Sequence, residues 1–86
     1  MRLDKYLKVS RIIKRRTLSK EMAESERVYV NDKVCKPSYQ VQIGDVIKVV
    51  FGRREIVIRV VQLKEHVLKD DSHLMYELLE DRKIEE

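Results

Sequence analysis

The sequence contains few of the residues that cross-link a chain or interrupt its elements. Its 86 residues include one cysteine, one proline, two glycines and no tryptophan. A single thiol, Cys35, cannot form an intramolecular disulfide, and no Cys-x-x-Cys pair is present to hold zinc. We therefore expect the protein to reside in a reducing, cytoplasmic compartment.

Long apolar runs are also missing. No stretch approaches the roughly 18 residues that a membrane helix requires, and the N-terminal segment lacks the uninterrupted hydrophobic core of a secretory signal. A mitochondrial-type presequence, which is also basic and amphipathic, is the remaining targeting alternative, but the segment runs directly into the rest of the sequence. We expect one soluble domain with no membrane partner.

Residues arranged for catalysis are scarce. His66 and His73 stand seven apart, without the i, i+4 spacing of a helical metal pair. The serines have no nucleophile-elbow context, and Gly44 and Gly52 cannot build a phosphate-binding loop. The sequence therefore predicts neither an enzyme nor a catalytic residue, metal or cofactor.

Charge is abundant and unevenly distributed. Charged residues make up 40% of the chain, with a net charge of +4. Residues 1–20 contain eight Lys or Arg and one acid, whereas residues 64–86 contain four basic and eight acidic residues. This asymmetry predicts a basic N-terminal surface for an anionic partner and an acidic C-terminal end that avoids it.

The basic segment also has helical periodicity. Apolar residues from Arg2 to Ile13 fall on one side of a helical wheel and basic residues on the other. Lys14 would fall in the apolar stripe, so the helix is expected to end near Ile13, with "KRR" as a turn. Thr17 is a reasonable N-cap for a second helix through about Ser25.

The period then changes to that of strands. Alternating residues predict strands over 28–30, 46–51 and 55–63, with a turn at Asn31-Asp32. Residues 64–86 leave two alternatives: a helix that starts at Ser72, or a further strand over 75–79, which we favour. The predicted fold class is α+β, with two N-terminal helices packed on a small curled antiparallel sheet.

An RNA partner explains the basic cluster better than DNA does. Arg binds phosphates through a planar fork and Lys through a compact charge. A DNA-reading helix-turn-helix would carry its base contacts on the second helix, but that helix contains glutamates. The candidate RNA-binding residues are Arg2, Lys5, Lys8, Arg11, Lys14, Arg15, Arg16 and Lys20. Asp4 and Thr17 are expected to support them, with Asp4 holding a neighbouring basic side chain in place.

Three segments together give a specific resemblance. "RLDKYLKVSRIIKRRTLSKEM", "RVYVND" and "VQIGDVIKV" resemble the RNA-binding domain named after ribosomal small-subunit protein four, also called the αL motif. The resemblance covers residues 2–63 and implies an RNA-binding domain over 1–63, followed by an acidic extension over 64–86. It departs from the motif at Glu26 and Asp32, where the family usually has glycine.

The resemblance also implies a function. The chain is similar to stand-alone members of this domain family, such as the small heat-shock protein that binds stalled large ribosomal subunits. It is more similar still to the RqcP family of bacterial ribosome quality-control factors, because of its opening residues and "MYELLE". That family implies binding to the large ribosomal subunit, its ribosomal RNA and peptidyl-tRNA. The implied partner is RqcH, in the C-terminal alanine tailing of stalled nascent chains.

Two further expectations complete the interpretation. Arg16, directly before Thr17, matches the turn arginine of the motif and is the strongest single candidate for RNA contact. No apolar stripe is left over for a subunit interface, so a monomer is expected. A generic structured-RNA-binding, assembly or heat-shock factor is the alternative function.

Overall fold

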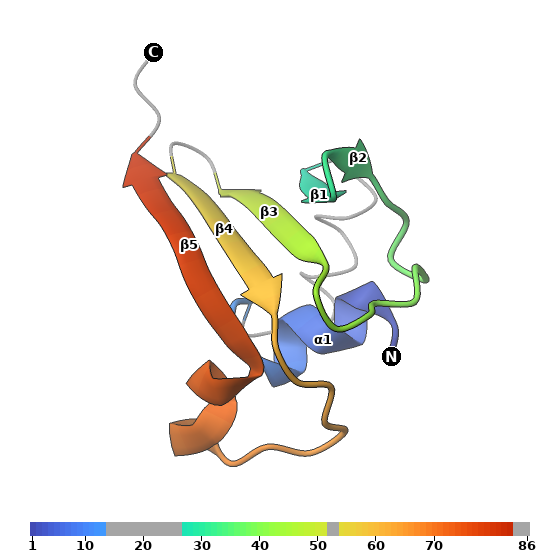
Figure 1. The fold of residues 1–86 in the computed structure, drawn as a ribbon, viewed down its shortest axis with the longest axis vertical. Coiled ribbons are helices and arrows are strands. Elements are labelled where there is room, and N and C mark those ends of the chain that lie inside the picture. The colour runs from blue at the N-terminus through green and yellow to red at the C-terminus, as the bar shows by residue number, and fades with distance from the viewer. Residues whose placement is uncertain (14–26, 52–53, 84–86) are drawn as a thin grey trace.

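A computed structural model describes residues 1–13, 27–51 and 54–83 (Figure 1). Helix α1 covers Leu3–Val9, and strands β1 and β2 cover Val28–Val30 and Lys33–Val34. Strands β3 and β4 cover Val46–Phe51 and Arg54–Val60, and a 3-10 helix, η1, at Lys69–Met75 leads into strand β5 at Tyr76–Lys83. The five strands form one antiparallel sheet in the order β2-β1-β3-β4-β5.

This architecture corrects the predicted fold class. Two N-terminal helices on a small curled sheet is the wrong description, because the described residues form a five-stranded sheet with one short N-terminal helix and one 3-10 helix. The second helix was expected at residues 17–25, which lie outside the described residues. The segment assigned to an acidic extension supplies η1 and the longest strand of the sheet.

Helix α1 ends four residues before the predicted boundary at Ile13. The Ser10 hydroxyl donates to the carbonyl oxygen of Tyr6 at 2.7 Å, a local bond that competes with helix continuation. Arg11 then adopts a left-handed backbone with φ of 60°, which is a common way for a helix to end. Because Ile13 N–H still reaches the carbonyl of Leu7 at 3.0 Å, the apolar side chain of Ile13 stays in the core.

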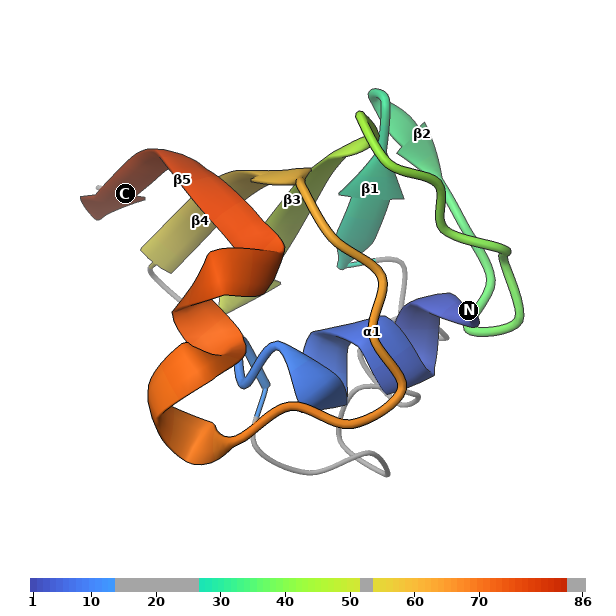
Figure 2. The same cartoon turned by 60° about the horizontal axis from the view of Figure 1, so that its bottom comes forward.

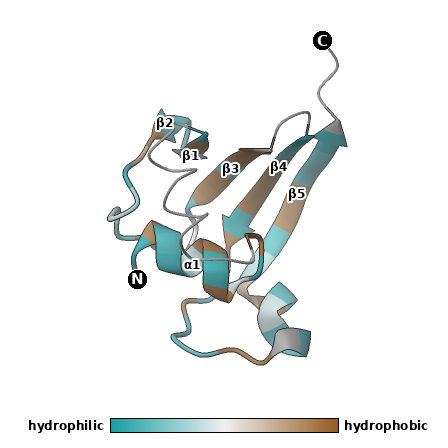
Figure 3. Ribbon diagram, turned by 180° about the vertical axis from the view of Figure 1, so that it is seen from behind, coloured by the Kyte–Doolittle hydropathy of each residue, from teal (hydrophilic) through white to brown (hydrophobic). Residues whose placement is uncertain are grey.

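The core lies between α1 and one face of the sheet (Figure 2). Hydrophobic and hydrophilic bands alternate along α1 in Figure 3, as its amphipathic sequence predicts. Ile47 and Val49 of β3, and Ile58 and Val60 of β4, are two residues apart on their strands and are buried in the core. The fully or nearly fully buried hydrophobic residues are Leu3, Tyr6, Leu7, Ile13, Val28, Val30, Val41, Ile47, Val49, Ile58, Val60 and Met75.

The strand alternative for the C-terminal segment is confirmed, since β5 covers Tyr76–Lys83 and pairs with β4. Side-chain ion pairs join the two strands: Arg54 with Asp81, Arg59 with Glu77, and Arg82 with Glu55. The Arg54–Asp81 and Arg59–Glu77 pairs are exposed, and pairs of this kind each contribute about 0–1 kcal/mol, so they select the register of β5 more than they stabilise the fold. The third pair differs, because the side chain of Glu55 is only 10% exposed.

Candidate RNA interface

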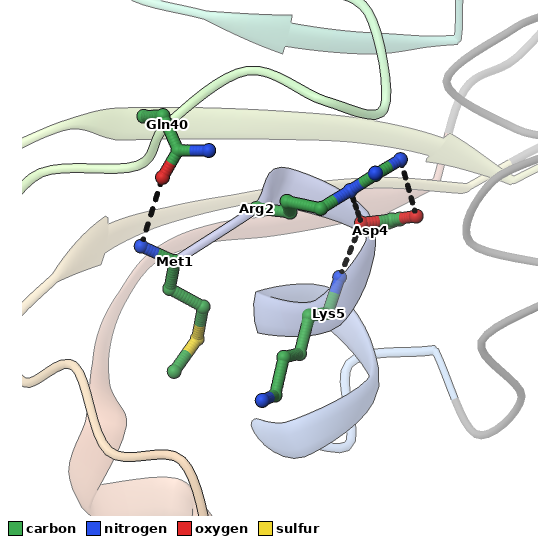
Figure 4. A network of polar contacts seen from close by, with 5 residues as sticks. All are labelled: Met1, Arg2, Asp4, Lys5 and Gln40. Carbon is green, nitrogen blue, oxygen red and sulfur yellow. Dashed lines mark hydrogen bonds and ion pairs between the residues drawn. The ribbon is translucent and has the colours of Figure 1, made fainter.

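The N-terminal end of α1 is fixed by hydrogen bonds to residues 37–41. The backbone N–H groups of Leu3 and Asp4 donate to the carbonyl oxygens of Tyr39 and Pro37 at 2.8 and 3.2 Å. The Met1 ammonium donates to Gln40 Oε1 at 3.2 Å (Figure 4). These bonds satisfy donors that the first turn of a helix leaves without intrahelical partners. They also fix the direction in which the basic side chains of α1 point.

Arg2 and Asp4 form an ion pair at this end of the helix. Arg2 Nε and Nη2 donate to Asp4 Oδ1 and Oδ2 at 3.2 and 3.4 Å. The Asp4 side chain is 3% exposed and that of Arg2 is 44% exposed. Asp4 Oδ1 also accepts from the backbone N–H of Lys5 at 2.8 Å. The structure therefore contains the contact expected of Asp4, which holds a basic neighbour while leaving part of that guanidinium at the surface.

Lys5 points away from Arg2 (Figure 4) and pairs with Glu65, sixty residues later in the sequence. The hydrogen bond from Lys5, and then its charge, hold the pKa of the Glu65 carboxyl below its usual range. The charge of Lys5 is thus matched within the protein. The structure assigns Lys5 a contact that the sequence did not suggest, whereas its role in RNA binding stays a prediction.

A groove of about 340 Å³ lies between α1 and the segment at residues 65–67. Lys8 and Arg11 from the helix side face this groove, with His66 from the other side, and all three are exposed. The Lys5–Glu65 pair also lies along it, together with the half-buried side chains of Val9 and Val67. The groove thus combines a net positive charge with two apolar side chains, and such a mixture of cations and apolar surface suits a nucleotide.

The predicted RNA surface is only partly within the described residues. Arg2, Lys5, Lys8 and Arg11 are described, and they do not form one continuous patch, because Arg2 and Lys5 point in different directions (Figure 4). The remaining candidates, Lys14, Arg15, Arg16, Thr17 and Lys20, lie outside the described residues. Their assignment stays a prediction.

The two later motif segments contact each other away from α1. The Asp45 carboxylate, buried at 9% exposure, accepts from Asn31 Nδ2 at 3.1 Å and from the Tyr39 hydroxyl at 3.0 Å. It also accepts from the backbone N–H of Gln42 at 2.9 Å. Burial, followed by the bond to Asp45, raises the pKa of Tyr39. Because Tyr39 also bonds to Leu3 through its carbonyl, this network supports the segment that anchors α1.

Other kinds of site find no geometric support in the described residues. Residues 1–13, 27–51 and 54–83 bring together no group of three or more His, Cys, Asp or Glu side chains that could hold a metal. Within the same ranges, no helix has the length and apolar character needed to span a membrane. The basic groove and its anchor are therefore the best-supported candidate site.

Comparison with known proteins connects this geometry to a family. The S4 domain model matches residues 1–47. The RQC P-site tRNA stabilizing factor of Streptococcus pneumoniae is 43% identical over 86 residues, which cover 100% of this chain and 98% of that protein. The factor of the same name from Bacillus subtilis is 44% identical, with both chains covered completely. The chain belongs to the family of RQC P-site tRNA stabilizing factors.

This member of the RQC P-site tRNA stabilizing factor family is also similar to a heat-shock protein of known structure. The trimeric structure of Vibrio cholerae Heat Shock Protein 15 matches with a TM-score of 0.86 and 30% identity. The match covers 92% of this chain and 81% of that one. The resemblance to ribosomal-protein-type RNA-binding domains is therefore confirmed at the level of family.

Sequence reasoning about this family member missed the groove wall formed by residues 65–67. From the sequence, His66 is only a histidine that lacks the spacing of a metal pair, and Glu65 is no more than one residue of the acidic extension. Neither residue lies within the matched S4 segment, and no local motif marks them. Only the three-dimensional pairing with Lys5 places them beside α1.

Proposed function

We propose that this protein is a non-catalytic RNA-binding translation factor that acts on the large ribosomal subunit in ribosome-associated quality control. On this proposal it contacts large-subunit ribosomal RNA and peptidyl-tRNA in the cytoplasm. The observation that carries the proposal is similarity over the whole chain to factors named for stabilizing the P-site tRNA in this process. Two exposed cations support it: Lys8, on a helix anchored at its N-terminal end, and Arg11, two residues after that helix ends.

The finer part of the proposal concerns the reaction that the factor assists. We propose that it supports C-terminal alanine tailing of stalled nascent chains together with RqcH. Holding a tRNA in its donor position would raise the fraction of productive encounters without any chemistry by the factor, because positioning removes an entropic cost from the reacting complex. The basic surface requires no catalytic residue for this role.

The fraction of wild-type protein that co-sediments with large subunits carrying peptidyl-tRNA tests the proposal. Lys8→Glu should lower the affinity for these subunits by at least ten-fold, because it replaces a cation proposed to bind phosphate with an anion that phosphate repels. Lys33→Glu, on strand β2, is the matched control: it makes the same charge change at an exposed site outside the groove. Equal loss in both variants would indicate a non-specific charge effect and contradict the assigned surface.

Arg16→Glu is the second test, since Arg16 is the strongest candidate in the motif. Arg2→Glu is not a suitable test of Arg2, because it would place a carboxylate beside the buried Asp4 and disturb the fold. Addition of alanine to the stalled chain in the presence of RqcH measures the finer role. Normal tailing in the absence of the factor would contradict that role.

The alternative is a generic structured-RNA-binding, ribosome assembly or heat-shock factor, and the similarity to a protein named Heat Shock Protein 15 supports its heat-shock part. Sequencing of the RNA bound to protein recovered from cells separates the two. Enrichment of peptidyl-tRNA together with large-subunit RNA would support the quality-control role, whereas a dispersed set of transcripts would favour the alternative. Sedimentation equilibrium measures the oligomeric state and so tests the predicted monomer. The measurement is of interest because the structure of that relative is trimeric.

A further inference from the structure

The groove beside α1 has properties that a merely solvated basic helix would lack. Its two sides come from segments more than fifty residues apart in the sequence: α1 with its C-terminal turn, and residues 65–67. The Lys5–Glu65 pair joins them at one place along the groove. The charges of Lys5 and Glu65 offset each other. The net positive charge of the residues that line the groove therefore comes from Lys8 and Arg11.

The size and lining of the groove limit what it can hold. A volume of about 340 Å³ is at the lower end of the range for small-ligand sites, which is too small for a duplex but sufficient for one nucleotide. Lys8 and Arg11 offer donors to a phosphate, and Arg11 can bind it through two parallel hydrogen bonds. The His66 imidazole offers a flat ring, and unpaired bases in RNA stack on such rings.

We infer that this groove binds a single unpaired nucleotide of RNA, with its phosphate between Lys8 and Arg11 and its base against His66. The inference rests on the proposed function, because it adds a binding subsite to the same RNA surface. Glu65 is a positioning residue here: its bond to Lys5 holds residues 65–67 against α1, so that His66 faces the two cations. The subsite extends RNA recognition beyond the segment matched by the S4 domain model.

The test uses His66→Ala, with His73→Ala as its matched control, because both histidines are exposed and only His66 lines the groove. The probe is an RNA hairpin with an unpaired loop, compared with a fully paired duplex of the same stem. His66→Ala should weaken hairpin binding about five-fold or more, the loss expected for one stacked base. His66→Ala should leave the affinity for the duplex unchanged, and His73→Ala should leave the affinity for the hairpin unchanged. His66→Tyr should restore the hairpin affinity that His66→Ala loses, because tyrosine again supplies a ring.

The salt dependence of hairpin affinity distinguishes the loss of a stacked base from the loss of a phosphate contact. Lys8→Ala should reduce the slope of log affinity against log salt by about 0.7–0.9 for a lost phosphate contact, whereas His66→Ala should leave the slope unchanged. Equal affinities for His66→Ala and His73→Ala would overturn the inference. So would failure of His66→Tyr to restore binding.

The same variants distinguish this inference from the proposed function. If Lys8→Glu abolishes binding to the large subunit while His66→Ala has no effect there or on the hairpin, the proposed function stands and the subsite does not exist. If the wild type does not bind subunits but binds the hairpin through His66, the subsite stands and the proposed function fails. No binding to either partner would overturn both.

Discussion

Asn31, in the turn between β1 and β2, is hydrogen-bonded to Asp45, directly before β3. Asn31 Nδ2 donates to Asp45 Oδ1 at 3.1 Å, while Asn31 Oδ1 accepts from the backbone N–H of Val46 at 3.0 Å. The backbone N–H of Asn31 in turn donates to the carbonyl of Val46 at 2.8 Å. One side chain thus joins the β1–β2 turn to the start of β3, which explains in physical terms why the motif combines an Asn turn with a later Gly-Asp.

Replacement of Asp45 by alanine should destabilise the protein by about 3 kcal/mol, because three donors lose their acceptor in a largely buried site. Urea denaturation gives the free energy of unfolding. Glu80→Ala, which removes an exposed carboxylate on β5, is the control and should change it by less than about 0.5 kcal/mol. A similar effect of the two substitutions would show that the Asp45 network contributes little.

Asp32→Gly should stabilise the protein. Asn31 and Asp32 have φ of 52° and 68°, and glycine at the second position removes a left-handed strain of about 1 kcal/mol net. Asn31→Gly is the matched contrast, because it relieves the same kind of strain but loses the side-chain bonds to Asp45 and Val46. We expect the thermal midpoint to rise for Asp32→Gly and to fall for Asn31→Gly; the same direction of change in both would refute this account.

Arg11→Gly should separate stability from RNA binding. Arg11 has φ of 60° at the end of α1, so glycine should stabilise the fold by about 0.5–1 kcal/mol after allowing for its greater freedom in the unfolded chain. RNA affinity should fall nonetheless, because the guanidinium is lost from the groove. Thermal unfolding and hairpin binding measure the two effects, and a stabilised variant with unchanged affinity would remove Arg11 from the binding surface.

Tyr6→Phe should lower stability by about 1 kcal/mol near neutral pH, because it removes the 2.8 Å bond from the hydroxyl to the carbonyl of Met75. Burial, and then the charge of Tyr76, raise the pKa of Tyr6 far above its ordinary value. The unfolded chain therefore releases this proton first, so the wild type loses stability as the pH rises above about 10. Phenylalanine cannot ionise.

The comparison of urea midpoints at neutral and strongly alkaline pH checks this prediction for Tyr6. The difference between wild type and Tyr6→Phe should shrink as the pH rises above about 10. Tyr29→Phe, at a half-buried position on β1, is the control and should show a smaller change. A constant difference between wild type and Tyr6→Phe across the pH range would contradict the assigned burial.

Local patterns were sufficient to predict much of this fold. The helical period identified the inward side of α1, and Leu3, Tyr6 and Leu7 are all fully buried. Alternation identified β1, β3 and most of β4, since strand periodicity depends only on which side chains face the core. The turn at Asn31-Asp32 followed from residues that tolerate left-handed backbone.

Features that depend on contacts between distant segments could not be predicted in this way. The helix was expected to continue to Ile13, because a wheel does not register the bond from Ser10 to Tyr6 or the left-handed Arg11. The pairing of Lys5 with Glu65 joins residues sixty apart, so the groove has no local signature. The predicted architecture was wrong for a related reason: local patterns indicated a strand over 75–79, but not its pairing with β4 at the edge of a five-stranded sheet.

The bond between Tyr6 and Met75 has a consequence for the order of events during synthesis. Met75 leaves the peptidyl-transferase centre 69 residues after Tyr6, and its carbonyl also accepts from Val61 and Gln62. The basic helix is made first but reaches its final seat only when residue 75 has emerged. Each newly made copy therefore completes the packing of α1 late in translation, and any function that depends on the seated helix must wait until then.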